Sequence, residues 1–184
     1  MPKKVKKTRG ADVARQLAKL SAHSDGPARA RQALAEVGVV LVALDHLPGT
    51  FVDGAAICRR DGAPVIALTL RHDRIDNFWF TLMHEFAHVS CHLGEDTPLI
   101  LDDLDVNSSD GIEAEADAFA RNALIPNELW EDRRSESLDT DDVLAIAREA
   151  QVHPAIVAGR WRWEYGDYRR FSKLLGRGEV RLHF

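Results

Sequence analysis

One short stretch of this chain, His84-Glu85-Phe86-Ala87-His88, predicts how the rest of the fold is arranged. On an α-helix, residues four apart lie on the same face, so the imidazoles of His84 and His88 can bind one metal ion. Zinc is the expected ion, since imidazole nitrogens are among its usual ligands. Glu85 lies about 100° further round the helix, where its carboxylate can reach a metal-bound water. The stretch therefore predicts a helix that carries a metal centre.

The residues around this stretch also favour a buried helix. The run 77–92 contains neither Gly nor Pro, Asp76 or Asn77 can cap its start, and Gly94 can end it. Apolar side chains surround most of its circumference, as is typical of a helix inside a core. They include Phe78, Trp79, Leu82, Met83, Phe86, Val89 and Leu93. Because buried histidines need polar partners, a metal ion is the expected partner for this pair.

A third ligand is expected from a second helical stretch, residues 111–124. Glu113 and Asp117 are four apart and share one face of that helix. Two histidines and Glu113, with water in the fourth position, would form a catalytic zinc site. Asp117 would accept a hydrogen bond from the outer nitrogen of a ligating histidine. Glu115 is the fallback ligand. The alternative interpretation of Glu113 is that it belongs to an acidic helix face turned to solvent.

His92, one turn after His88, is expected to support the site or the fold rather than to bind the metal.

The two segments together resemble a known family. Residues 82–92 (LMHEFAHVSCH) and 113–126 (EAEADAFARNALIP) resemble the ImmA/IrrE family of zinc metallopeptidases. The resemblance implies an α+β, zincin-like fold with a small twisted sheet and an active-site helix. By position, His84, His88 and Glu113 would bind Zn²⁺, and Glu85 would be the general acid and base. Such a site can also accept Mn²⁺, Fe²⁺ or Co²⁺. The expected activity is hydrolysis of a peptide bond in one specific protein, such as a DNA-bound transcriptional repressor or a stress regulator.

A second resemblance keeps another function open. Residues 71–80 (RHDRIDNFWF) and 153–160 (HPAIVAGR) resemble segments of HigA-type antitoxins that carry an ImmA/IrrE domain. Those proteins usually begin with a helix-turn-helix, and the N-terminal region of this chain shows no complete one. The alternative function is therefore an antitoxin-like or regulatory protein-binding module with a zincin core and little or no catalysis.

The spacing of residues does not identify the group that would stabilise an oxyanion. Its candidates are His72, His92, His153, Tyr165 and Tyr168.

Composition narrows the class of protein. With 184 residues, 45% of them hydrophobic, the chain can bury one sizeable core. The net charge of −5 argues against general affinity for nucleic acid, so direct DNA binding is not expected. No apolar run is long enough to span a bilayer and no signal-peptide pattern follows the basic start, so a cytoplasmic protein without a membrane partner is expected. Cys58 and Cys91 do not make a disulfide framework.

The order of patterns along the chain predicts three parts. They are a flexible basic arm (1–10), a zincin-like metallopeptidase domain (11–130) and a helical C-terminal extension packed on the core (131–184). Strands are expected at 39–44, 55–59 and 65–70, the last two joined by a hairpin turn at Asp61-Gly62. Strand 65–70 is either an edge that binds substrate or an interior strand. Residues 95–110 read as an acidic loop.

The C-terminal extension has its own open question. Helices are expected over 140–151, with Thr140 as the cap, and from 154 to 163. The pair resembles a helix-turn-helix, in which Arg160 and Arg162 would face DNA. We expect instead a structural pair packed on the core.

Overall fold

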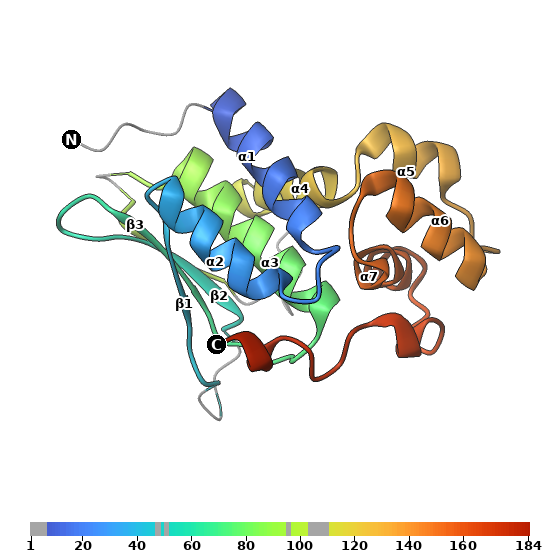
Figure 1. The fold of residues 1–184 in the computed structure, drawn as a ribbon. Helices are drawn as coiled ribbons and strands as arrows, with labels where there is room; N and C mark the ends of the chain where they lie inside the picture. Colours follow the sequence, from blue (N-terminus) through green and yellow to red (C-terminus); the bar gives the residue numbers. More distant parts are fainter. Residues whose placement is uncertain (1–6, 47–48, 50–51, 95–96, 103–110) are drawn as a thin grey trace.

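A computed structural model describes residues 7–46, 49, 52–94, 97–102 and 111–184 of the chain. Its fold is α+β, as expected from the sequence, with a small sheet at one end and helices beside it (Figure 1). The helices are α1 (Lys7–Leu20), α2 (Gly26–Glu36), α3 (Ile75–Ala87), α4 (Ile112–Leu124), α5 (Asn127–Arg133), α6 (Thr140–Ala150) and α7 (Pro154–Tyr165). The strands are β1 (Val40–Ala43), β2 (Gly54–Cys58), β3 (Pro64–Leu68) and β4 (Leu99–Asp102). A π-helix, η1 (His88–His92), continues α3. Two 3₁₀ turns, η2 (Ser172–Leu174) and η3 (Arg181–His183), lie in the tail that follows α7, residues 166–184.

The strands form one sheet in the order β1-β3-β2-β4. β1 is parallel to β3, whereas β2 is antiparallel to both β3 and β4. The predicted hairpin between β2 and β3 is confirmed, with Gly62 at φ +82° in the turn. Because β3 is paired on both sides, the hypothesis that strand 65–70 offers a free edge to substrate is wrong. Among the described strands, β1 and β4 are the edges.

Two elements near the metal-binding motif differ from the prediction. The expected acidic loop 95–110 contains β4, which forms because its backbone pairs with β2, a contact that local sequence does not reveal. Residues 95–96 and 103–110 of that loop lie outside the described part. Helix α3 begins at Ile75 with Arg74 as the N-cap, not Asp76 or Asn77. The tail explains this start, since the backbone N–H of Ile75 donates to the carbonyls of Leu175 and Gly176.

Two further boundaries shift by a few residues. Helix α1 already begins at Lys7, so the end of the predicted arm 1–10 is helical, while residues 1–6 lie outside the described part. Helix α6 is capped by Asp139 rather than Thr140. Asp139 Oδ1 accepts from the Asp142 N–H at 2.9 Å, and Asp142 Oδ2 accepts from the Asp139 N–H at 3.0 Å. This reciprocal pair satisfies two backbone donors and so outcompetes a threonine cap.

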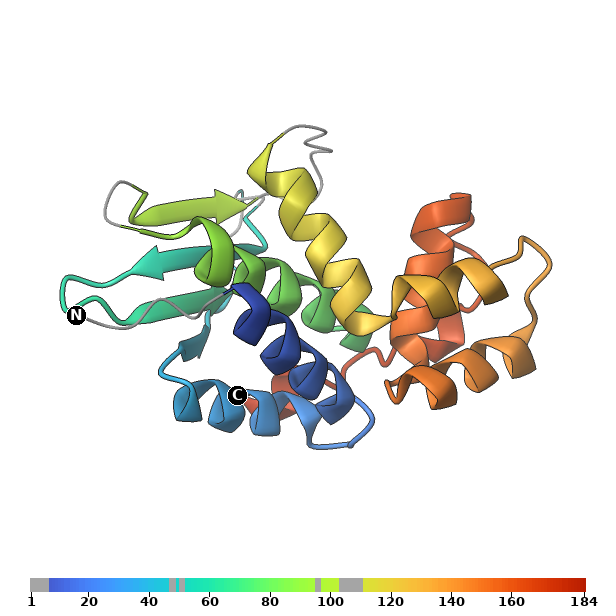
Figure 2. The ribbon, with the colours of Figure 1, turned by 90° about the horizontal axis from the view of Figure 1, so that it is seen from above.

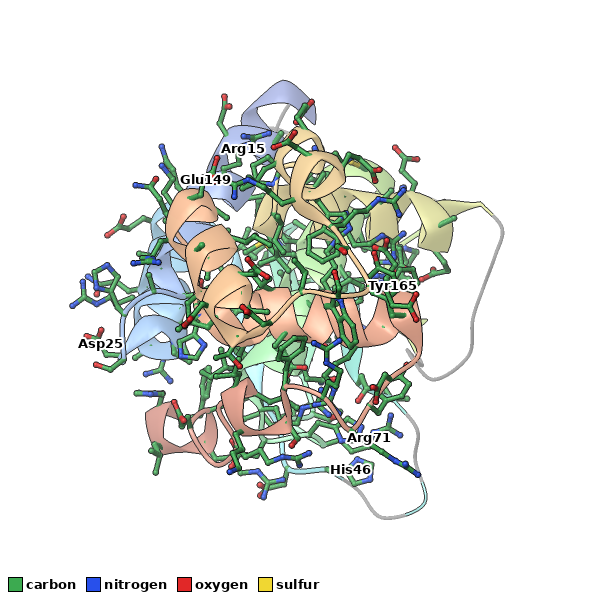
Figure 3. The ribbon with its side chains drawn as sticks, turned by 90° about the vertical axis from the view of Figure 1, so that its right-hand side faces the viewer. Arg15, Asp25, His46, Arg71, Glu149 and Tyr165 are labelled. Atoms are coloured by element: carbon green, nitrogen blue, oxygen red, sulfur yellow. The ribbon has the colours of Figure 1, made fainter. Side chains whose placement is uncertain are left out.

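One cluster of buried side chains holds the helices together. Its largest members are Trp79, Phe78 and Phe86 of α3 with Trp130 of α5 and Trp161 of α7. Helices α5–α7 lie at the end of the molecule away from the sheet (Figures 1 and 2). Viewed from that side, they stand in front of α3, with Tyr165 at the end of α7 (Figure 3). The division at residue 130 into a domain and an extension stays a prediction, although the buried cluster runs through both parts.

The tail returns to the first helices. Phe184 packs on Phe78 with ring centroids 5.8 Å apart, and Arg31 of α2 lies over the Phe184 ring at 5.6 Å. An isolated β-bridge joins Arg74 to Arg177. The C-terminal segment thereby holds the start of α3, the helix that carries the metal-binding motif. No helix in the described part of the chain has the length and apolar character needed to cross a bilayer.

Candidate metal centre

Helices α3 and α4 bring three predicted ligands together. His84 Nε2 lies 3.0 Å from His88 Nε2 and 3.1 Å from Glu113 Oε2. His88 Nε2 lies 3.4 Å from the same oxygen of Glu113. Both histidines are buried, and the side chain of Glu113 is 22% exposed. Among the described residues, this trio is the one group that could hold a metal ion.

The spacing of the three atoms fits a small divalent cation. Ligand atoms of a tetrahedral zinc ion, at its usual bond lengths, lie about 3.3 Å from one another. The three observed separations, 3.0, 3.1 and 3.4 Å, bracket that value. Two imidazoles and one carboxylate also match a catalytic zinc site chemically. The arrangement therefore suits zinc or a similar divalent metal.

Glu85, which follows His84 on α3, lies against the sheet. Its side chain is fully buried, and Gly54 of β2 faces it. A Cβ atom on Gly54 would lie 2.1 Å from Glu85 Oε1, which is impossible without a shift. Glycine at this position therefore makes the room in which the carboxylate lies. No motif marks Gly54 in the sequence, where its one local signal is a glycine at the start of a strand.

An ion pair fixes the start of β2, next to Gly54. Asp53 accepts hydrogen bonds from Nε and Nη2 of Arg71, labelled in Figure 3, at 3.1 and 2.9 Å. Both side chains are largely buried, at 4% and 12% exposure. The Thr69 hydroxyl donates to the Val52 carbonyl at 2.9 Å. Such a two-bond arginine–carboxylate contact is geometrically specific, so the strand that faces Glu85 is held firmly.

Asp117 contacts the outer nitrogen of His84, as its position in the sequence predicts. His84 Nδ1 and Asp117 Oδ1 are 2.9 Å apart, and Arg121 Nη1 donates to Asp117 Oδ2 at 3.1 Å. Burial alone raises the pKa of Asp117. The hydrogen bond from His84 and the charges of His84 and Arg121 outweigh burial, so this pKa lies below its usual value. Asp117 is therefore a carboxylate that can orient His84.

His92 and Glu115 occupy the outer side of His88. His92 Nδ1 lies 2.9 Å from His88 Nδ1, and His92 Nε2 lies 3.3 Å from Glu115 Oε2. Glu115 is 47% exposed and does not belong to the trio of ligand atoms. The structure thus places Glu115 on His92, not in the position of a fallback ligand. The catalytic and metal-binding roles assigned to all these residues stay predictions.

The other oxyanion candidates lie on α7 and nearby turns. His153 caps α7, with its Nδ1 accepting from the Ala155 N–H at 3.1 Å. Tyr165 packs on Trp161 with ring centroids 5.1 Å apart, and Tyr168 is 61% exposed. His72 is exposed at the turn before α3. These positions leave the choice of an oxyanion-stabilising group open.

The two arginines considered for DNA contact point inward. Arg160 Nη1 donates to the carbonyls of Arg121 and Ile125, at 3.2 and 3.1 Å, and its guanidinium lies 4.5 Å from the Trp130 ring centroid. Burial lowers the pKa of Arg160 to about 10. Arg162 is 5% exposed and donates to the Tyr168 carbonyl. This geometry favours a helical pair packed on the core.

Comparison with known proteins agrees with the geometry. The family model described as the IrrE N-terminal-like domain, Peptidase_M78, matches residues 34–162 of the 184. The matched part contains both histidines, Glu85, Glu113 and the helices that carry them. A search of curated proteins found no match. The resemblance to HigA-type antitoxins stays a prediction. The chain belongs to the IrrE N-terminal-like (Peptidase_M78) family.

Proposed function

We propose that this protein is a zinc-dependent endopeptidase that cuts a specific protein. The observation that carries the proposal is the meeting of His84, His88 and Glu113, with Glu85 on the same helix as the histidines. The family to which the chain belongs is a peptidase family, which supports the reaction class. A transcriptional repressor or stress regulator is the proposed substrate, supported by the resemblance to ImmA/IrrE proteins.

In this proposal, Nε2 of His84, Nε2 of His88 and the carboxylate of Glu113 hold the metal. When bound there, zinc supplies a Lewis acid that lowers the pKa of a coordinated water to about 7. Glu85 accepts a proton from the attacking water as its oxygen bonds to the peptide carbonyl carbon. Glu85 then delivers that proton to the leaving nitrogen as the C–N bond breaks. By accepting a hydrogen bond from Nδ1 of His84, Asp117 would leave the Nε2 lone pair of His84 available for a metal.

The test compares protein termini in cells that produce wild type with those in cells that produce Glu85→Gln. The substitution is nearly isosteric and removes the proton acceptor, so it should keep the metal and lose cleavage. We expect new N-terminal peptides from one or a few proteins in wild-type cells and their absence with Glu85→Gln. The same new termini in both samples would contradict the peptidase proposal.

The binding-module alternative gives a different outcome in the same cells. It predicts a protein that co-purifies equally with wild type and Glu85→Gln, with no new termini in either. Metal content does not separate the two functions, because a module can also bind zinc structurally. Cleavage that depends on Glu85 does separate the peptidase from the binding module.

A further inference from the structure

His88, the second proposed metal-binding histidine, is supported by two residues outside the stretch 84–88. They are His92 and Glu115. His84, His88 and His92 form a stripe in which neighbouring ring centroids are 4.8 and 4.9 Å apart. In the first pair the Nε2 atoms face each other, whereas in the second pair the Nδ1 atoms do. His88 therefore uses one nitrogen toward the candidate metal centre and the other toward His92.

The contact between His88 and His92 lies in a π-helical stretch of backbone. The α-helix changes to the π-helix η1 at His88, and the Leu93 N–H donates to the His88 carbonyl at 2.8 Å. A π-turn is rare and often lies at functional sites, because it reorients side chains within a helix. Here it covers the five residues from His88 to His92. The change of helix type and the Nδ1 contact thus coincide.

The hydrogen-bond directions follow from the metal site. If Nε2 of His88 is reserved for the metal, its proton must be on Nδ1, which then donates to Nδ1 of His92. His92 in turn must carry its proton on Nε2, where it donates to Glu115 Oε2. The series ends on a carboxylate, as the shorter one from His84 does on Asp117. Helix α4 thus supplies the proposed ligand Glu113 and the final acceptors of the two series, Glu115 and Asp117, which follow it by two and four residues.

We propose that His92 and Glu115 are positioning residues that hold His88 in its metal-binding tautomer and orientation. This inference rests on the proposed metal centre. Outer hydrogen-bond partners of metal-binding histidines typically contribute about 10–100-fold in metal affinity. Glu115 contacts His92, which in turn contacts His88. His92 is 7% exposed and Glu115 is 47% exposed, so a change at Glu115 is tolerated sterically.

The experiment measures the Zn²⁺ dissociation constant of the full chain by chelator competition. We expect His92→Ala to weaken zinc binding about 10–100-fold. His92→Asn should recover part of the loss, because its Oδ1 can replace Nδ1 as the acceptor for His88. Glu115→Gln should weaken binding less than His92→Ala. The double variant His92→Ala/Glu115→Gln should bind zinc as His92→Ala does, because the two residues act in series.

The matched controls are His23→Ala and Glu136→Gln, which change exposed residues and should bind zinc as wild type does.

A spectroscopic readout separates positioning from general stability. At saturating Co²⁺, His92→Ala should change the visible absorption of the bound ion, since the His88 ring is no longer fixed, whereas the His23→Ala spectrum should match wild type. Zinc affinity in His92→Ala and Glu115→Gln equal to wild type would overturn the inference while leaving the metal centre intact. Failure of the wild-type chain to bind Zn²⁺ would overturn the metal centre itself, and the inference with it. If His92→Ala does not fold, His92→Asn and Glu115→Gln decide the question.

Discussion

The backbone of Gly54 passes so close to Glu85 that a Cβ atom on Gly54 would lie 2.1 Å from Glu85 Oε1 and 2.7 Å from its carboxyl carbon. The central sheet and the motif helix are thereby fitted to each other at the residue proposed to move the proton. The position of Glu85 depends on β2 as well as on its own helix.

Gly54→Ala should therefore displace Glu85 and lower the cleavage rate without removing the metal ligands. A displacement of about 1 Å costs on the order of 100-fold in rate. The rate is measured on a peptide that spans the cleavage site found from cellular termini, and metal content is measured alongside. Gly94→Ala is the control, because nothing lies within 4 Å of a Cβ there. A Gly54→Ala protein that cleaves as wild type does would show that Glu85 is not held by this contact.

Asp117→Ala should weaken zinc binding by about 10–100-fold, because His84 loses the acceptor on its outer nitrogen. Asp117→Asn should be less harmful, since its amide oxygen can still accept from Nδ1. Chelator competition measures both. Arg121→Gln tests the next contact outward and should have a smaller effect, because Arg121 contacts Asp117, which in turn contacts His84. Unchanged zinc affinity in Asp117→Ala would show that Asp117 does not support the binding of zinc by His84.

Arg160→Ala should destabilise the fold by about 1.5–3 kcal/mol, the usual contribution of hydrogen bonds to a charged group. The guanidinium joins α7 to the carbonyls at the end of α4 and stacks on Trp130. Urea unfolding measures the loss, with the exposed Arg169→Ala as the control. A free energy of unfolding equal to that of wild type would show that this junction contributes nothing to stability. A variant that loses DNA binding while it stays folded would restore the DNA-contact hypothesis.

Acid should destabilise the protein partly through His153. Burial lowers the pKa of His153 below its ordinary value of 6.5, with Glu179 and Asp76 opposing the shift. The folded state therefore binds this proton less readily than the unfolded state. The resulting contribution to the free energy of unfolding is full above pH 6.5 and is lost as the pH falls toward the lower, folded-state pKa.

His153→Asn should reduce this pH dependence, because asparagine can accept the Ala155 N–H but does not titrate. Urea unfolding of wild type and variant at about pH 7.5 and about pH 5.5 measures the difference. Equal loss of stability in both proteins over that interval would assign the acid sensitivity to other groups.

The sequence predicted those features that have a local signature. The motif helix, the Asp61-Gly62 hairpin and the α4 helix follow from periodicity, turn residues and the absence of breakers. The meeting of His84, His88 and Glu113 follows from four-residue spacing and a family resemblance. Each of these signals lies in residues close together in the chain.

The features that were missed depend on tertiary contacts. β4 exists because β2 offers it a partner, and the start of α3 is set by the carbonyls of Leu175 and Gly176, a hundred residues away. The space that Gly54 leaves for Glu85 is likewise a consequence of packing. No pattern along the sequence marks which glycine will face a carboxylate.

Elemental mass spectrometry of the purified chain decides whether a metal centre exists, when wild type is compared with Glu113→Ala and with the control Glu136→Gln. We expect about one zinc or similar divalent ion per chain in wild type and control, and its loss with Glu113→Ala. A wild-type protein that carries no metal even after reconstitution, or a Glu113→Ala protein that keeps it, would contradict the proposed centre at His84, His88 and Glu113.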